Sequence, residues 1–154
     1  MNKAARLGIV TSGCVLVALA CSSGAQESPN QAFKPLVSVM ELMQQTITPA
    51  TDQLWSAYNA PSTPAEWRAM ENAAATLLAA SSLVATGGTG DMDNDWAKEP
   101  AWQAYNAAMI TAGQTALTAS RAQDIDGLLE AGDLLLAPCE GCHQQFNPAV
   151  VNAQ

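Results

Sequence analysis

The sequence predicts an all-α protein, an antiparallel four-helix bundle with its functional motif near the C-terminus. Four segments carry apolar residues at helical spacings of three and four, and no stretch of any length alternates apolar and polar residues as a strand does. Three short breaks separate the segments, at residues 59–63, 86–95 and 121–124. Amphipathic helices joined by short connections pack beside one another in antiparallel order, which favours the bundle.

The first segment covers residues 35–58, and Pro49 interrupts it. A proline inside a helix removes one backbone hydrogen bond, so we expect a kink here or a split after Thr48. The residues expected on its inner face are Leu36, Val39, Met40, Met43, Ile47 and Leu54.

The second segment, residues 64–85, has a well-marked start. Thr63 can cap the helix, Pro64 suits the first helical position, and Glu66 completes a capping box with Thr63. Two glycines, Gly87 and Gly88, follow its end. Its expected inner face consists of Trp67, Met70, Ala74, Leu77, Ser81 and Val84.

The third segment begins near Asp95 or Glu99 and continues to about Ser120. Its stripe contains small residues that let a neighbouring helix or a flat ligand approach closely. The residues of this stripe are Trp102, Tyr105, Met109, Ala112, Ala116 and Ala119.

The fourth segment begins after Asp124, a good N-cap, and has the most regular stripe in the chain. Pro138 lies within it and is expected to bend the helix just before Cys139. The stripe consists of Ile125, Leu128, Leu129, Gly132, Leu135, Leu136, Cys139, Cys142, His143 and Phe146.

The N-terminus resembles a bacterial export signal. Lys3 and Arg6 precede an uncharged apolar run that is too short to span a bilayer comfortably. Cys21 follows small residues, as in a lipoprotein signal, so we expect a signal at residues 1–20 and lipidation of Cys21; ordinary cleavage is the alternative. Residues 21–32 then form a flexible tether to a bundle at 33–154. This organisation predicts a protein on the periplasmic side of a bacterial cell envelope.

The charge of the exported part is strongly negative. Residues 21–154 keep all fourteen acidic residues and four of the six basic ones, so the formal net charge goes from −8 for the whole chain to −10. An acidic surface repels phosphate, which argues against a nucleic-acid partner. It attracts a partner protein with a basic docking surface.

The chemistry of the chain is concentrated in one motif, Cys139-Glu-Gly-Cys142-His143. This is the C-x-x-C-H attachment signature of c-type haem. Positions i, i+3 and i+4 share one face of a helix, so both thiols can reach the haem vinyl groups while His143 points at the iron. Glu140 and Gly141 are expected to face away, which leaves their identity nearly free. We therefore expect one covalent haem c.

Three other interpretations of the motif are weaker. A zinc site needs a fourth ligand, and the body of the chain offers no further cysteine or histidine. A thioredoxin-like motif belongs at a helix N-terminus after a strand, whereas this one lies at the end of an all-helical pattern. A chance match is disfavoured by the export signal and by the position of the motif on the apolar stripe.

With a C-terminal C-x-x-C-H on the last helix of an exported four-helix bundle, the chain resembles the cytochrome c′ family, including its low-spin, Met-ligated members. The resemblance covers residues 33–146, and the aromatic three residues after the histidine matches Phe146. It implies that His143 is the fifth iron ligand and that the chain forms a homodimer through its first two helices. Two features differ from many members: Asn147 replaces a basic residue, and the first helix has no arginine.

The residue opposite His143 decides the function. A second histidine ligand is excluded because His143 is the only histidine. In the resembled family the opposite residue comes from the first helix, which here offers Met43 and, as the alternative, Met40; both could also simply fill core space. A methionine sulfur would give a six-coordinate electron-transfer haem, whereas an open face would bind NO or CO.

These patterns predict a one-electron carrier rather than an enzyme, with a gas-binding or sensing haem protein as the alternative. A peroxidase would need a polar acid–base group opposite His143, and no second histidine can supply it. The acidic residues between the second and third segments, Asp91, Asp93, Asp95 and Glu99, are interpreted as a solvated loop. A calcium loop is the alternative, but Trp96 and Trp102 stand where a calcium loop needs Gly and Glu.

Overall fold

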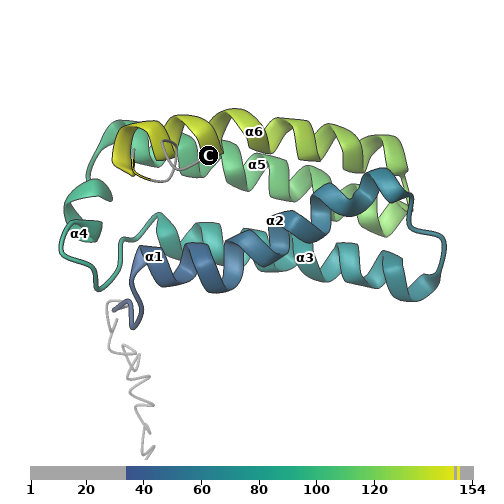
Figure 1. The fold of residues 1–154 in the computed structure, drawn as a ribbon, viewed down its shortest axis with the longest axis horizontal. Helices are drawn as coiled ribbons and strands as arrows, with labels where there is room; N and C mark the ends of the chain where they lie inside the picture. The colour runs from purple at the N-terminus through teal and green to yellow at the C-terminus, as the bar shows by residue number, and fades with distance from the viewer. Residues whose placement is uncertain (1–33, 148, 150–154) are drawn as a thin grey trace, which may run out of the picture. The chain divides into compact units, whose positions relative to one another are not determined.

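The computed structural model describes residues 34–147 and Ala149, and every element in that part is helical (Figure 1). The predicted all-α class is thus confirmed for these residues. The predicted signal at 1–20, the lipidation site Cys21 and the tether at 21–32 lie outside the described residues. The elements are α1 (Val39–Leu42), the π-helical turn η1 (Met43–Ile47), α2 (Thr48–Trp55), the 3-10 turn η2 (Ser56–Asn59), α3 (Pro64–Val84), α4 (Asp93–Trp96), α5 (Pro100–Ala122) and α6 (Ile125–Phe146).

The start of α3 is held by the capping box that the sequence predicts. The Glu66 backbone N–H donates to the Thr63 hydroxyl at 3.2 Å, and the Thr63 N–H donates back to the Glu66 carboxylate at 2.8 Å. Pro64 occupies the first helical position, where no backbone donor is needed. Every residue of the predicted inner stripe of this helix is buried.

The first helical segment departs from the expectation in two ways. It begins at Val39 rather than near Pro35, because Ser38 and Glu41 form a capping box there. The irregularity in its backbone also lies at Met43–Ile47, before Thr48, whereas a split was expected after Thr48. The Thr48 N–H donates to the Met43 carbonyl, five residues back, so the backbone makes a wide π-turn. A wide turn relieves the clash between a proline ring and the carbonyl four residues before it, and α2 then continues through Pro49.

The last two long helices begin and end at clear signals. α5 begins at Pro100 and ends before Gln123, which adopts a left-handed conformation with φ 55°. Asp124 then caps α6 by accepting a hydrogen bond from the Gly127 N–H at 3.2 Å. α6 continues as one helix through Pro138 to Phe146.

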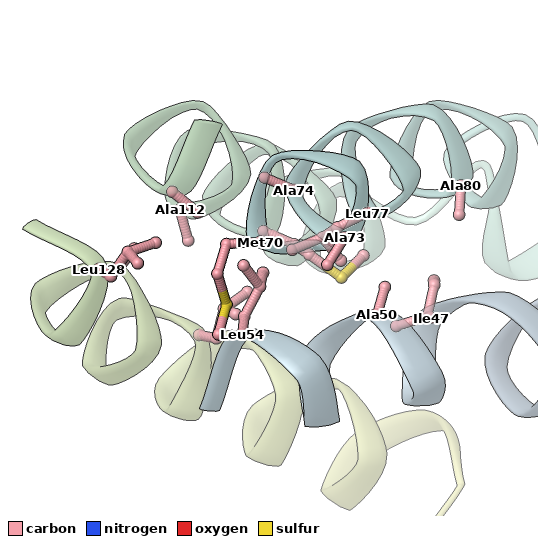
Figure 2. Close-up of a cluster of buried hydrophobic side chains, with 14 of the residues drawn as sticks. Ile47, Ala50, Leu54, Met70, Ala73, Ala74, Leu77, Ala80, Ala112 and Leu128 are labelled. Atoms are coloured by element: carbon pink, nitrogen blue, oxygen red, sulfur yellow. The ribbon is translucent and has the colours of Figure 1, made fainter. Parts of the chain in front are cut away.

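The helices pack in a consistent set of pairs around one apolar core. α5 packs against both α3 and α6, and α2 packs against α3 and α6. Figure 1 shows the chain from α1 to η2 running obliquely, beside α3 at its start and approaching α6 at its end. In Figure 2 the side chains of Ile47, Ala50 and Leu54 lie toward those of α3. This oblique path separates the first segment from α6 at the end of α6 that carries the cysteines.

Two tryptophans link neighbouring helices, α2 to α6 and α5 to α3, by hydrogen bonds to backbone carbonyls. The Trp55 indole N–H donates to the Gly132 carbonyl on α6 at 3.0 Å, and the Trp102 indole N–H donates to the Val84 carbonyl on α3 at 3.1 Å. Each bond satisfies a polar group within an otherwise apolar contact. None of the helices in the described residues is both long enough and apolar enough to cross a membrane.

Four residues expected on inner faces are instead exposed. Leu36 precedes the first helix and is 87% exposed, and Met40 is 46% exposed. Leu129 and Leu136 are exposed because their neighbours Leu128 and Leu135 occupy the core positions of α6. A helical stripe predicted from spacing alone was therefore wider than the face that α6 actually buries.

The acidic connection between α3 and α5 also differs from the expected solvated loop at one residue. Asp93 is buried, and its Oδ2 accepts hydrogen bonds at 2.8 Å from the backbone N–H groups of Val39 and Gly90. The Thr89 N–H donates to the Val37 carbonyl at 3.1 Å. The loop is thus fixed to the start of α1, and the Asp93 carboxylate is used by backbone donors rather than left for calcium.

The capping box of α3 makes a testable contribution to stability. Replacing Thr63 by alanine removes the cap and should lower the free energy of unfolding by about 1 kcal/mol in urea denaturation. Replacing Glu66 by glutamine should instead change the pH dependence of stability. Hydrogen bonds from the backbone N–H groups of Ser62 and Thr63 lower the pKa of Glu66 from its usual 4.5 to about 2.

Because the folded pKa lies below the unfolded one, the stabilisation by Glu66 is present above about pH 4.5 and is lost as the pH falls toward 2. The Glu66→Gln variant should show a smaller loss of stability across that window than the wild type. Identical acid profiles for the two proteins would contradict this role. Gln145→Ala, at an exposed position on α6, is a control that should leave the profile unchanged.

Candidate functional site

Cys139, Cys142 and His143 lie in the last two turns of α6, directly after the buried Pro138. Both cysteines are free thiols and half-buried, and both pack against the apolar core. The spacing of three and four residues places all three side chains along the inner half of the helix. The three residues that the sequence predicts to act together are therefore brought together by one helix.

Two cavities adjoin these residues. The thiol cavity has a volume of about 600 Å³, and both cysteines line it. The end cavity has a volume of about 490 Å³ and lies toward α4; of the two cysteines, only Cys142 lines it. They share four lining residues: Met43, Thr48, Cys142 and His143. Each volume is within the range of roughly 300–1,000 Å³ that ligand pockets usually have.

The candidate methionines differ in which of the two cavities they line. Met43 lines both cavities, as His143 does, whereas the half-exposed Met40 lines only the end cavity. Met109 is buried in the wall of the thiol cavity, and Met70 is buried in the core and lines neither. Met43 is thus the methionine of the first segment that shares both cavities with His143.

The backbone around Met43 is the π-turn η1. Met43 is its first residue, and its carbonyl accepts the five-residue bond from Thr48. Single π-turns inside α-helices are frequent at functional sites because they change the direction of the side chains within them. Only Glu41 and Leu42 lie between Met40, which is exposed and lines the end cavity alone, and Met43, which begins the π-turn and lines both cavities.

The site is apolar and acidic. Burial, followed by the charge of Glu140, raises the pKa of the Cys139 thiol, and burial followed by Cys139 raises the pKa of Cys142 to about 11. The acidic lining residues are Asp52 and Glu140 in the thiol cavity and Asp91 and Asp93 in the end cavity. No lysine or arginine of residues 34–147 lines either cavity. Both cysteines are therefore neutral thiols near pH 7.

Asn106 is a site residue that the stripe of α5 did not identify. It is 2% exposed and lines the thiol cavity. Its Nδ2 donates to the Trp102 carbonyl at 2.9 Å, but its Oδ1 accepts no hydrogen bond within the described part of the chain. A buried acceptor without a donor is costly, so its presence in a cavity wall fits a cavity that holds a further group. The only hint in the sequence that Asn106 faces the site is its position four residues, about one helical turn, after the stripe residue Trp102.

Tyr105 and Gly141 correct the expectation for the residues between the two cysteines. A Cβ added at Gly141 would lie 2.6 Å from Cε1 of Tyr105, so this position faces the tyrosine ring rather than solvent. Glu140, also expected to face away, lines the thiol cavity. Tyr105 lines the same cavity, and a Cβ at position 141 would fit only if the tyrosine ring moved.

An aromatic cluster closes the end cavity. Phe146, one turn after His143, packs edge-on against Trp102 with ring centroids 5.1 Å apart, and against Trp96 at 6.0 Å. Trp96 and Trp102 stack at 5.6 Å with an interplanar angle of 28°. The aromatic three residues after the histidine is therefore a packing residue of the cavity, and it connects α6 with α4 and α5.

The described residues contain no group of three or more His, Cys, Asp or Glu side chains arranged to hold a metal ion by themselves. The three motif residues thus do not form a preformed tetrahedral zinc site.

The contact between Gly141 and Tyr105 can be tested by substitution. Helix propensity alone predicts that Gly141→Ala stabilises the protein by up to about 1 kcal/mol. The clash with Tyr105 predicts the opposite sign, a loss of roughly 1–3 kcal/mol in the free energy of unfolding. In a Tyr105→Ala background the same substitution should cost less, because the ring is gone.

Ala137→Gly, at an exposed position one turn earlier, is the matched control and should cost about 1 kcal/mol through propensity alone. A gain of stability from Gly141→Ala in both backgrounds would show that the two helices do not meet at this residue.

In comparisons with known proteins, no protein family, no curated protein and no solved structure matches this chain.

Proposed function

We propose that the chain is an exported monohaem c-type cytochrome that acts as a one-electron carrier, with the four-helix-bundle architecture of the low-spin, Met-ligated members of the cytochrome c′ family. The observation that carries the proposal is the common location of four side chains. Both thiols of the C-x-x-C-H motif, His143 and Met43 line one cavity, and Met43 and His143 lie in the walls of both.

The residues present fit a covalent haem in three respects. The thiol cavity and the end cavity adjoin around His143, which provides space for a flat apolar group. The neutral thiols of Cys139 and Cys142 would add across the two vinyl groups of the haem. In that reaction a carbon–sulfur bond forms and the thiol hydrogen goes to the other vinyl carbon, so no oxidant is required. The unsatisfied Oδ1 of Asn106 fits a cavity whose contents extend beyond side chains.

A covalently held haem supplies a reversible one-electron couple at its iron. His143 would ligate through one imidazole nitrogen, and Met43 would provide a thioether sulfur from the first helical segment. The apolar residues in these walls, among them Ile47 and Met109, would limit the access of water and so the reorganisation that accompanies a change of charge. Histidine–methionine ligation raises the reduction potential relative to other ligand sets, as an electron carrier requires.

The structure lends less support to the thioredoxin-like interpretation. Reactive C-x-x-C thiols have a lowered pKa, usually because a helix N-terminus or a cation stabilises the thiolate. Cys139 and Cys142 lie at the C-terminal end of α6, and burial raises the pKa of both. Their chemistry is suited to permanent attachment rather than to thiol–disulfide exchange.

The negative charge and the N-terminal sequence support the rest of the proposal. The formal charge of −10 for residues 21–154 favours redox partners with basic surfaces. Lipidation at Cys21 would hold the carrier at the periplasmic side of the envelope, with residues 22–32 as a tether. One acyl-modified terminus concentrates the carrier near membrane-bound partners without restricting its rotation.

Covalent attachment is the first prediction of this proposal. The Cys139→Ser/Cys142→Ser variant, expressed with a c-type maturation system, should lose all haem staining after denaturing electrophoresis, because no thioether remains. The single variants should retain part of it. Cys21→Ser is the matched control: it should keep full haem staining.

Two outcomes separate attachment from anchoring. Wild-type protein without covalent haem under maturation conditions would overturn the proposed function. In the control variant, the protein should move from the membrane fraction to the soluble fraction; unchanged membrane retention would remove the lipid anchor from the proposal and leave haem attachment intact.

The sixth ligand is tested by Met43→Ala. The oxidised wild type should be low-spin and show the weak band at the red end of the visible spectrum that is typical of methionine bound to ferric haem. The variant should lose that band, bind CO when reduced, and have a midpoint potential lower by an amount on the order of 0.1 V, a fraction of the ~0.8 V that axial ligands span.

Met40→Ala is the control and should keep the spectrum, because Met40 is half-exposed and lines the end cavity alone. A high-spin wild-type spectrum with CO binding would instead support the gas-binding function. Loss of the band in Met40→Ala but not in Met43→Ala would assign the ligand to Met40.

A further inference from the structure

Three large apolar side chains are exposed together beside the end cavity. Val37, Met40 and Met92 are 39%, 46% and 49% exposed, and they come from the start of the first segment and from the α3–α5 connection. The Thr89 N–H bond to the Val37 carbonyl joins these two stretches, and Met40 and Met92 line the same cavity. They therefore belong to one surface, here called the Met40–Met92 face.

This surface is fixed by the fold. The buried Asp93 carboxylate accepts hydrogen bonds from the Val39 and Gly90 N–H groups at 2.8 Å, so the loop cannot swing away from α1 without breaking both. Exposed apolar groups on a rigid, preformed surface are typical of protein interaction sites.

Acidic side chains surround the face. Glu41 and Asp91 are exposed and adjoin Met40 and Met92 in the sequence, and Asp91 lines the same cavity as both methionines. Hydrogen bonds from Ser38 lower the pKa of Glu41, so it remains charged. The cation nearest in sequence to Asp91 is Lys98, which pairs with Asp95 at 2.8 Å. Residues 34–42 and 86–99 together contain five acidic residues but only two basic ones, Lys34 and Lys98. An apolar centre with an acidic margin is complementary to an apolar centre ringed by lysine and arginine.

The Met40–Met92 face is also the rim of a cavity that contains His143. Phe146 and Trp102 line that cavity, and the ring contacts of 5.1 to 6.0 Å continue from Phe146 to Trp96 at its edge. A partner bound here would therefore cover a cavity whose wall includes the proposed iron ligand His143. The competing exposed leucines on α6 lack this connection: Leu129 and Leu134 line neither cavity, and Leu136 is a single apolar residue at the edge of the thiol cavity.

We propose that the Met40–Met92 face is the docking surface for a redox protein whose own redox centre lies under an apolar patch ringed by basic residues. The inference rests on the proposed function. One electron would pass from the reduced centre of the partner to the oxidised iron that His143 would hold in this chain, and no atom would be transferred. Acidic residues at the margin raise the rate of encounter, and the apolar side chains contribute to the short contact distance.

The test uses the haem-loaded protein and, as probe, a small basic c-type cytochrome whose haem edge is ringed by lysines. The reduced probe is mixed with the oxidised protein in a stopped-flow instrument over a series of ionic strengths. The double variant Glu41→Gln/Asp91→Asn removes two charges from the face; glutamine can still serve the capping box with Ser38. The control Glu130→Gln/Asp133→Asn removes two exposed charges from α6 beside the competing leucines.

At low salt the second-order rate should fall roughly three- to tenfold in the face variant, with a shallower dependence on ionic strength, and less than twofold in the control. Met40→Lys gives the face a positive charge, which repels the basic probe, and should lower the rate further. Equal effects of the two double variants would overturn the proposal in favour of attraction by net charge alone, and a larger effect in the control would assign docking to α6.

The visible spectrum recorded before mixing separates this inference from the proposed function. If the haem spectrum is normal but the rate falls no more in the face variant than in the control, the docking surface alone is contradicted. A protein without haem contradicts the proposed function and the docking surface with it.

Discussion

The packing seam of α6 is the constraint on which the site depends. Leu128, Leu135 and Cys142 are spaced by seven residues, so the row of side chains that packs α6 into the core leads directly to the second thiol. A helix that buries the leucines must also direct the cysteines inward. The reactive residues are therefore positioned by ordinary helix packing, with Asp124 fixing where the helix begins and Trp55 bonding to the Gly132 carbonyl in its middle.

The space beside the cysteines comes from the other side of the fold. The first segment runs obliquely and packs on α6 mainly through α2 and η2, so its beginning lies apart from the cysteine end of α6. The π-turn η1 falls on this divergent stretch and includes Met43. α5, by contrast, approaches α6 closely, because Gly141 has no Cβ to meet Tyr105. One tight helix pair and one divergent pair together produce a cavity at one end of the molecule and a filled core at the other.

Much of this arrangement could be predicted from residue spacing, and the failures have definite physical causes. The start of α3 follows from Thr63 and Pro64, because local hydrogen bonds determine it, and its buried face follows from a regular apolar stripe. The exposure of Leu129 and Met40 could not be predicted, because the width of a buried face depends on which helices lie against it. Pro49 predicts a disturbance, but the backbone can respond on either side of a proline.

The polar residues of the site were harder still. Asp93 and Asn106 are buried because of tertiary neighbours far away in the sequence, and their residue types suggest exposure. The motif residues were predicted together because helical geometry alone relates them. Their relation to Met43 needed a structure, since spacing alone does not show that Met43 lines both cavities while Met40 is exposed.

The burial of the two thiols also has a consequence for biogenesis. α5 and α6 are adjacent in sequence, so their contact forms with little loss of loop entropy, and α6 follows the other described helices in the chain. In the closed chain Cys139 and Cys142 are neutral and half-covered, which makes them slow to oxidise and equally slow to be modified. A maturation enzyme would therefore gain access while the first helical segment is still undocked. For the proposed cytochrome, the order in which the helices close would then decide whether the chain acquires its haem or becomes compact before attachment.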